Sequence, residues 1–195
     1  MNWTEIDILN LVNLFKEKEY ILLNGIYQAN PLGIRAKIGY TNTFDDFICN
    51  LRKNHANVWE LLICEGTVDP GKYWMLHPMN PLGTFKICPG QTIDAFKIGY
   101  HQNKYRALVQ NRPIKGWRDN KIDLIYDEQK IGYGEGINLH HAGKHSIEIN
   151  NWSAGCQVIA IETEFDEYMK EVDEHIAYGY KQTFNYTLFL EEDLI

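Results

Sequence analysis

The chain has few of the features that mark nucleic-acid-binding, secreted and membrane proteins. Its 195 residues include 19 Lys and Arg against 26 Asp and Glu, a formal net charge of -7, and the cations form no cluster. Because phosphate binding depends on clustered Lys and Arg, this composition argues against a nucleic-acid partner. The opening MNWTEIDILN carries acids rather than a basic segment and has no continuous apolar run. We therefore expect no signal peptide and no membrane anchor, and a chain that is cytoplasmic as synthesised.

The cysteines also lack a pattern, because none of the 4 lies in CxxC spacing. That scatter is typical of reduced thiols rather than of a disulfide framework. Cys64 in WELLIC and Cys88 in FKIC lie in apolar runs, so we expect them to behave as small hydrophobic side chains. Only Cys156, which follows Ser-Ala-Gly, has a different context.

Helical periodicity recurs along the chain, with apolar residues spaced at i, i+3, i+4 and i+7. The segments with this spacing are 8–15, 44–51 and 165–172. Thr4 with Asp7 resembles a capping box for the first segment, and Thr163 with Asp166 resembles one for the third. These segments are therefore predicted to form amphipathic helices.

Between the second and third predicted helices the apolar runs become short and are separated by the turn signals DPG, NP, PG and RDN. The predicted strands are VWELLI, YWMLH, GTFKI, YRALVQ, KIDLIY, GINLH and CQVIAI, with FNYTLFL after the last helix. This order predicts an α+β fold with a strand-rich centre and flanking helices. Since no long linker divides the chain, residues 1–195 are expected to form one monomeric domain, with residues 1–58 as a helical N-terminal elaboration.

The segment GEGINLHHAGKHSIEINNWSAGCQVIAIE combines the residue types needed for thiol chemistry, because it places three histidines before a Ser-Ala-Gly-Cys turn. A thiol nucleophile needs a base, a sharp turn that exposes the sulfur, and backbone N–H groups that hold the oxyanion. Gly155 permits a tight or positive-φ backbone before Cys156. His140, at the end of the strand GINLH, can reach the thiol from a neighbouring strand.

Two other interpretations of this segment remain open. Cys156 can open a buried strand, with His140 as a hydrogen-bonded core histidine. Alternatively, the histidines and Cys156 can bind zinc, since imidazole and thiolate are both zinc ligands. Adjacent strand residues point to opposite faces, which argues against His140 and His141 sharing one ion. We therefore expect neither a metal nor a cofactor.

The segment resembles the catalytic motif of the L,D-transpeptidase family, in which a strand histidine precedes a Ser/Thr-His-Gly-Cys turn. His140 matches the upstream histidine, and Ser153, Gly155 and Cys156 match the turn. The flanking GTVDPGKYWM and NPLGTFKICPGQ are similar to hairpin-forming strands of that family, and the form WSAGCQV is similar to its phage-associated and bacterial members. The resemblance covers residues 59–162 and implies a strand-rich, L,D-transpeptidase-like β-sandwich core.

The resemblance also implies an activity, namely that of a cysteine peptidase acting on the stem peptides of bacterial peptidoglycan. Cys156 is then the nucleophile, His140 its base and Gly155 part of the oxyanion-binding turn. The missing export signal favours cell wall hydrolysis after release or delivery, as in bacteriolysis by a phage endolysin or a lytic effector. The alternatives are an L,D-transpeptidase that forms cross-links and a noncatalytic phage structural or binding module with the same fold.

Substrate contacts are expected around the same turn. Arg118 in GWRDN is suited to bind a stem-peptide carboxylate, although GWRDN can also be a solvated hairpin turn. Ala154 stands where the family motif has a histidine, so that role is missing or has moved to His141 or His145. The predicted substrate-binding residues are Ser153, Trp152, Arg118, His141, Gln157 and Asn138.

Overall fold

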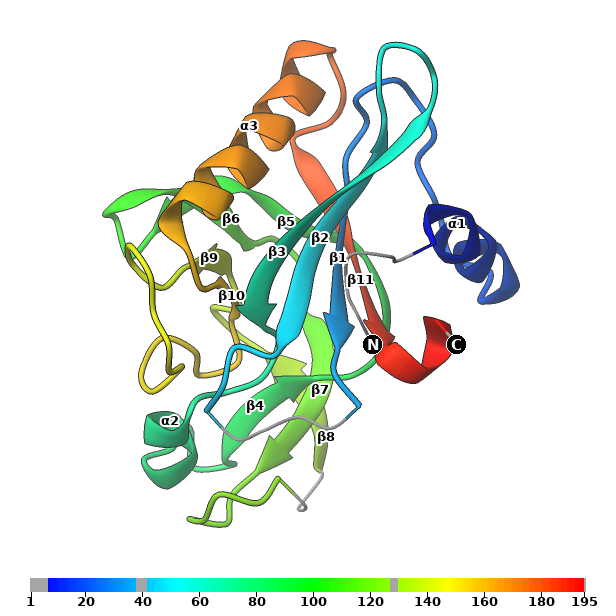
Figure 1. Cartoon of the computed structure of the whole chain (residues 1–195). Coiled ribbons are helices and arrows are strands. Elements are labelled where there is room, and N and C mark those ends of the chain that lie inside the picture. The colour runs from blue at the N-terminus through cyan, green and yellow to red at the C-terminus, as the bar shows by residue number, and fades with distance from the viewer. Residues whose placement is uncertain (1–6, 38–41, 127–129, 195) are drawn as a thin grey trace.

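The computed structural model describes residues 7–37, 42–126 and 130–194. Within this part of the chain the main sheet closes into a barrel, with the strand order β1-β11-β5-β6-β9-β10-β3-β2 (Figure 1). The barrel strands are β1 (Asn30–Arg35), β2 (Asp46–Lys53), β3 (Trp59–Thr67), β5 (Gly90–His101), β6 (Tyr105–Gln110), β9 (Leu139–His141), β10 (Gln157–Ile159) and β11 (Thr183–Leu190).

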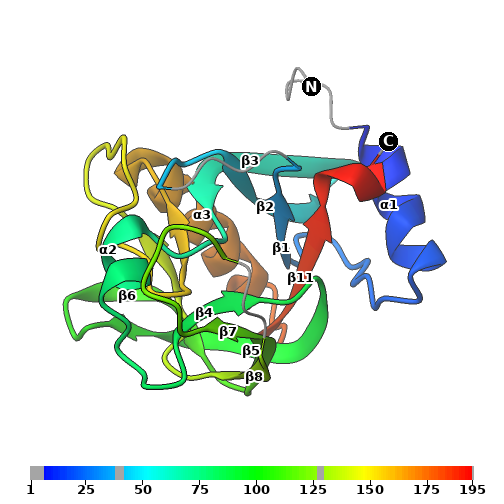
Figure 2. The same cartoon turned by 90° about the horizontal axis from the view of Figure 1, so that it is seen from below.

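A second, three-stranded sheet lies at one end of the barrel, below it in the view of Figure 1. Its order is β4-β7-β8, formed by β4 (Thr84–Ile87), β7 (Ile114–Asp119) and β8 (Lys130–Gly134). The helices are α1 (Ile8–Glu17), α2 (Lys72–Leu76), α3 (Glu162–Ala177) and the 3-10 helix η2 (Glu191–Leu194). Seen from below, α1 and α3 lie on different sides of the barrel (Figure 2). No helix among the described residues is long and apolar enough to cross a membrane.

Two apolar clusters hold these elements together. The main core combines barrel residues such as Leu108 and Leu139 with the apolar side of α3, including Phe165 and Val172. On the other side, Phe15 and its neighbours on α1 pack against the outward-facing side chains of β1, β2 and β11. The barrel wall is therefore covered by a helix on two sides, and several of its strands are buried on both faces.

That double burial explains why the helix predicted over 44–51 is wrong. These residues form most of β2, in which Ile48 belongs to the main core while its neighbour Cys49 packs under α1. A strand buried on both faces has a nearly continuous apolar sequence, so helical spacing can arise in it by chance. The predicted helical elaboration over 1–58 is wrong for the same reason, because β1 and β2 are part of the barrel wall.

Of the other secondary-structure predictions, some are confirmed and some are wrong. The structure confirms four of the predicted strands, namely YRALVQ, GTFKI, VWELLI and FNYTLFL. In contrast, YWMLH forms α2 and KIDLIY forms no regular element. The α+β class is confirmed, but the main sheet is a closed barrel rather than the expected sandwich.

The predicted helix caps also differ in outcome. Asp7 caps α1 and accepts a hydrogen bond of 2.8 Å from the Leu9 N–H, while Thr4 lies outside the described residues. The N-cap of α3 is Ile161, without a side-chain hydrogen bond, so Thr163 is not the cap.

Candidate active site

The pairing of β9 with β10 brings the predicted nucleophile and base to one face of the barrel wall. The two strands are parallel, and His140 is the register partner of Val158. Because strand side chains alternate, Cys156 shares the face of Val158, two residues further on. The cluster in which Cys156 packs beside Ala142, Val158 and Ala160 confirms this placement.

The turn before Cys156 is held by Ser153. The Ser153 hydroxyl accepts a hydrogen bond from the Gly155 N–H at 3.1 Å and donates one to the Cys156 carbonyl at 2.8 Å. Ser153 has no exposed surface, so its position favours a role in shaping the turn rather than in contacting substrate. Gly155 has φ +125°, and a Cβ there would lie 2.8 Å from the Phe85 carbonyl oxygen. The positive φ predicted at Gly155 is confirmed.

The thiol of Cys156 is protonated in the resting protein. Its Sγ lies 3.5 Å from the Asn138 N–H, which donates to it, and 3.6 Å from the Gly136 carbonyl. Burial raises the pKa of this thiol to about 11, although the Asn138 N–H opposes the shift. Among the interactions of the described residues, no hydrogen bond joins Cys156 to His140.

His140 is a neutral imidazole whose tautomer is set by the backbone. Its buried environment, with a further contribution from His101, lowers its pKa to about 3. The Nδ1 atom lies 3.0 Å from the His141 carbonyl and 3.4 Å from the Tyr105 hydroxyl, and because a carbonyl only accepts, the shorter contact favours the proton on Nδ1. Nε2 is then the basic nitrogen, and it is buried without a hydrogen-bond partner among the described residues. The backbone carbonyl of Trp152 also interacts with the ring and favours its charged form.

Two further side chains of this site, His101 and Tyr105, were not predicted. The His101 ring stacks on the His140 ring, with 3.9 Å between centroids, and its Nδ1 accepts a hydrogen bond of 3.1 Å from the Asn138 amide. The Tyr105 hydroxyl donates to the His141 carbonyl at 3.2 Å. Both residues flank the turn between β5 and β6, and the pairing of β6 with β9 brings them to the site. Their spacing in the sequence carries no signal for this contact.

Two of the predicted substrate-binding residues point away from the face of Cys156. The His141 ring lies on the opposite side of β9 from His140, 4.2 Å from the Tyr105 ring and 5.1 Å from the Phe165 ring. Gln157 is fully buried and accepts a hydrogen bond from the Tyr186 hydroxyl. These positions favour packing roles for both, and their assignment as substrate contacts stays a prediction.

Arg118 lies on β7 rather than in a hairpin turn. Its guanidinium donates to the Gly83 carbonyl at 3.0 Å and to the Tyr133 carbonyl at 3.2 Å. It lines a hollow of about 170 Å³ together with Ala154, the residue two positions before Cys156. Arg118 and the cysteine turn therefore line one hollow, and the role of Arg118 in binding a carboxylate stays a prediction.

A larger hollow of about 750 Å³ is lined by residues 109–113 and 133–136 with Asn138. Gly136 and Asn138 are also the partners of the Cys156 sulfur. Glu135 lines both this hollow and the one that contains Arg118. The two hollows thus share Glu135, and each is lined by residues close to Cys156, although Cys156 itself lines neither. Trp152, with 41% of its surface exposed, is the most open of the predicted contacts near the turn.

The described residues contain no group of three His, Cys, Asp or Glu side chains arranged to hold a metal ion. The opposite orientations of His140 and His141 account for this at the cysteine turn. Comparison of the chain with protein-family models, with curated proteins and with solved structures gives no significant match.

Proposed function

We propose that this protein is a cysteine peptidase that cleaves stem-peptide bonds of bacterial peptidoglycan through an acyl-thioester on Cys156. The observation that carries the proposal is the arrangement of Cys156 and His140 on one face of adjacent strands, with His140 held as the tautomer whose Nε2 is free to accept a proton. A buried nitrogen without a partner is costly to maintain, which favours a functional role for it.

The chemistry begins from the neutral pair. As the Cys156 sulfur attacks the carbonyl carbon of the scissile amide, its proton passes to Nε2 of His140. The tetrahedral intermediate collapses when the C–N bond breaks and the imidazolium returns the proton to the leaving amine. Water then attacks the thioester, His140 takes one of its protons, and the thiol is restored as the acid product leaves.

Backbone donors near the sulfur are suited to the negative charge that develops on the carbonyl oxygen. The N–H groups of Ala154 and Cys156 form no hydrogen bond within the described chain, whereas that of Gly155 is already donated to Ser153. The oxyanion is therefore assigned to the N–H groups of Ala154 and Cys156. A free carboxylate of the peptide stem is assigned to the hollow that Arg118 lines, because a guanidinium binds a carboxylate through two parallel hydrogen bonds.

A second candidate function is transpeptidation, in which an amine rather than water resolves the thioester. The larger hollow near Cys156 favours it, because an acceptor stem must be held in attack geometry to compete with water. The segments 100–119 and 132–136 are the parts of the chain that could form a groove for an acceptor stem. Because they are short, their length alone predicts hydrolysis by water. Both segments nevertheless contribute residues to the larger hollow. A third candidate is a noncatalytic binding module. The raised pKa of the Cys156 thiol favours it, because the thiolate is the nucleophilic form of cysteine.

Digestion of purified peptidoglycan, followed by mass analysis of the fragments, tests these functions together. The cysteine peptidase predicts new free carboxyl and amino ends at one stem-peptide bond, lost in Cys156→Ala and kept in the control Cys88→Ala. A labelled D-amino acid incorporated in place of free product indicates transpeptidation. If neither product forms while labelled peptidoglycan sediments with the protein, the protein is a binding module.

A further inference from the structure

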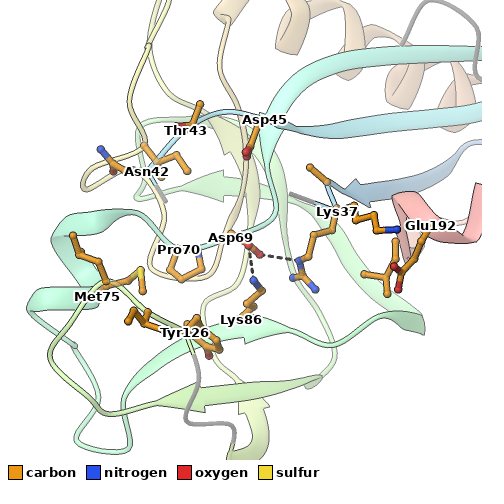
Figure 3. A pocket seen from close by; sticks show the side chains of 16 residues that line it. Lys37, Asn42, Thr43, Asp45, Asp69, Pro70, Met75, Lys86, Tyr126 and Glu192 are labelled. Carbon is orange, nitrogen blue, oxygen red and sulfur yellow. Dashed lines mark hydrogen bonds and ion pairs between the residues drawn. The ribbon is translucent and has the colours of Figure 1, made fainter. Parts of the chain in front are cut away.

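A third hollow, shown in Figure 3, lies near the ends of β1, β4 and β11, and Cys156 is not among its lining residues. It has a volume of about 520 Å³ and shares no lining residue with the two hollows near the thiol. Small-molecule sites commonly enclose about 300–1,000 Å³ and combine apolar walls with a few convergent polar groups. The volume of this hollow is therefore that of a ligand site.

Charged side chains from three parts of the chain meet in its wall. Arg35 of β1 donates to one oxygen of Asp69 at 2.9 Å, and Lys86 of β4 donates to the other oxygen at 2.6 Å (Figure 3). Burial alone would raise the pKa of Asp69, but the charges of Arg35 and Lys86 outweigh it and hold that pKa below its ordinary value. Two cations thus share one ionised carboxylate.

Both cations keep unused hydrogen-bond donors. Beyond Asp69, Arg35 donates only to the Ile87 carbonyl at 2.9 Å, and Lys86 has only the face of the Tyr126 ring, 5.3 Å from its Nζ. A guanidinium has five N–H donors and an ammonium has three. Within the described chain, three donors of Arg35 and two of Lys86 therefore have no acceptor.

The nearest other buried acid does not use these donors. Both oxygens of Asp46 accept backbone hydrogen bonds of 2.9 Å, one from the Ala36 N–H and one from the Val68 N–H. Burial and the charge of Asp69 raise the pKa of Asp46 to about 7, so this carboxyl carries only part of a negative charge at neutral pH. Among the charged side chains that meet in the wall, Arg35 and Lys86 are thus opposed directly by one carboxylate, that of Asp69.

The remaining walls are largely apolar. The apolar and aromatic lining residues are Pro70, Met75, Leu124, Ile125, Tyr126 and Ile149. The Tyr126 hydroxyl lies 2.9 Å from the Thr84 carbonyl and 2.7 Å from the Trp117 carbonyl, and its single proton, shared between these two acceptors, fixes the ring beside Lys86. Lys37, Asp45 and Glu192 also line the hollow, and the two acids disfavour a ligand with more than one negative charge.

We propose that this hollow binds a small organic anion with a single carboxylate. The carboxylate lies against Arg35 and Lys86, and the apolar part of the ligand lies against Tyr126 and Met75. The site is independent of the chemistry proposed at Cys156, because the two share no residue. Phosphate monoesters offer similar oxygen acceptors but carry more charge.

Titration of the full chain with phenylacetate, phenylacetamide and phenyl phosphate tests the site, with binding measured by calorimetry and by amide chemical shifts. We expect phenylacetate to bind at least about tenfold more tightly than phenylacetamide, since a charged hydrogen-bond partner commonly contributes at least that factor. Lys86→Met should weaken phenylacetate binding by a similar factor. The matched control Lys97→Met removes an exposed lysine of β5 that does not line the hollow and should bind normally, as should Cys156→Ala.

Equal binding of phenylacetamide, or binding by none of the three probes, overturns the proposal. Tighter binding of phenyl phosphate overturns the preference for a carboxylate. If Lys86→Met does not fold, the chemical shifts of the unmodified protein decide, because the proposal requires the largest shifts at Arg35, Lys86 and Tyr126. Shifts confined to other parts of the chain contradict it.

Discussion

The imidazole ring of His101 stacks on that of His140 with 3.9 Å between centroids and an interplanar angle of 18°. Burial lowers the pKa of both rings, and the charge of a protonated His101 further opposes protonation of His140. The stack therefore helps to keep His140 neutral, which is the form that can accept the proton of Cys156. This relationship makes His101 a positioning residue for the proposed base.

A first prediction concerns the nucleophile. Cys156→Ala should reduce kcat on peptidoglycan by about 10⁴-fold or more, because removing a covalent nucleophile leaves only binding and oxyanion stabilisation. Cys88→Ala, which removes another partly exposed thiol, should retain activity. Rates are measured as fragment release on proteins with matched thermal melts. Near-normal release by Cys156→Ala would show that another residue forms the covalent bond.

A second prediction separates the adjacent histidines. His140→Ala should lower kcat by about 10²–10⁴-fold, the usual contribution of a general base. His141→Ala should have a much smaller effect on kcat, since its ring packs on the opposite side of β9 against Tyr105 and Phe165. Steady-state kinetics of both variants, with melts to separate stability from chemistry, provide the test. The reverse order of effects would place the base on the other face.

A third prediction concerns the stack. His101→Gln keeps an amide acceptor for Asn138 but removes the charge that opposes protonation of His140, so the low-pH limb of kcat/KM should move to higher pH. The exposed His145 provides the control, and His145→Gln should leave the limb in place. A pH profile for His101→Gln that overlays the unmodified one would assign His101 a packing role only.

The sequence predicts the local backbone geometry of the cysteine turn better than it predicts which residues surround that turn. Gly155 and the separation of His140 from His141 follow from local rules, namely the conformational freedom of glycine and the alternation of side chains along a strand. His101 lies in another part of the chain and reaches the site only through barrel closure, which no local pattern encodes. The error at β2 has the same origin, since α1 and the barrel core bury its two faces from distant parts of the sequence.

A fourth prediction tests the shape of the turn. Gly155→Ala should lower the free energy of unfolding by about 1–3 kcal/mol, because φ +125° is strained for other residues and the new Cβ meets the Phe85 carbonyl at 2.8 Å. Gly132→Ala is the matched control, since a Cβ there has no neighbour within 4 Å. Denaturant titration measures both. Equal stability of the two variants would mean that the turn relaxes without cost.

The last prediction follows from the burial of His140, which lowers its pKa from 6.5 to about 3. In the unfolded chain this imidazole takes up a proton as the pH falls below about 6.5, whereas in the folded protein it stays neutral until about pH 3. The unfolded state therefore binds more protons across that window, and His140 destabilises the fold progressively as the pH drops.

Each unit of pKa difference corresponds to about 1.36 kcal/mol, so the loss reaches the order of a few kcal/mol near pH 3. His101 and His175 have lowered pKa values and act in the same direction, so only the difference between proteins isolates His140. His140→Asn should show a smaller fall in unfolding free energy between pH 6.5 and 3 than the unmodified chain, as measured by denaturant titration at several pH values. Parallel curves for the two proteins would mean that His140 takes up its proton in the folded state and cannot be the buried neutral base.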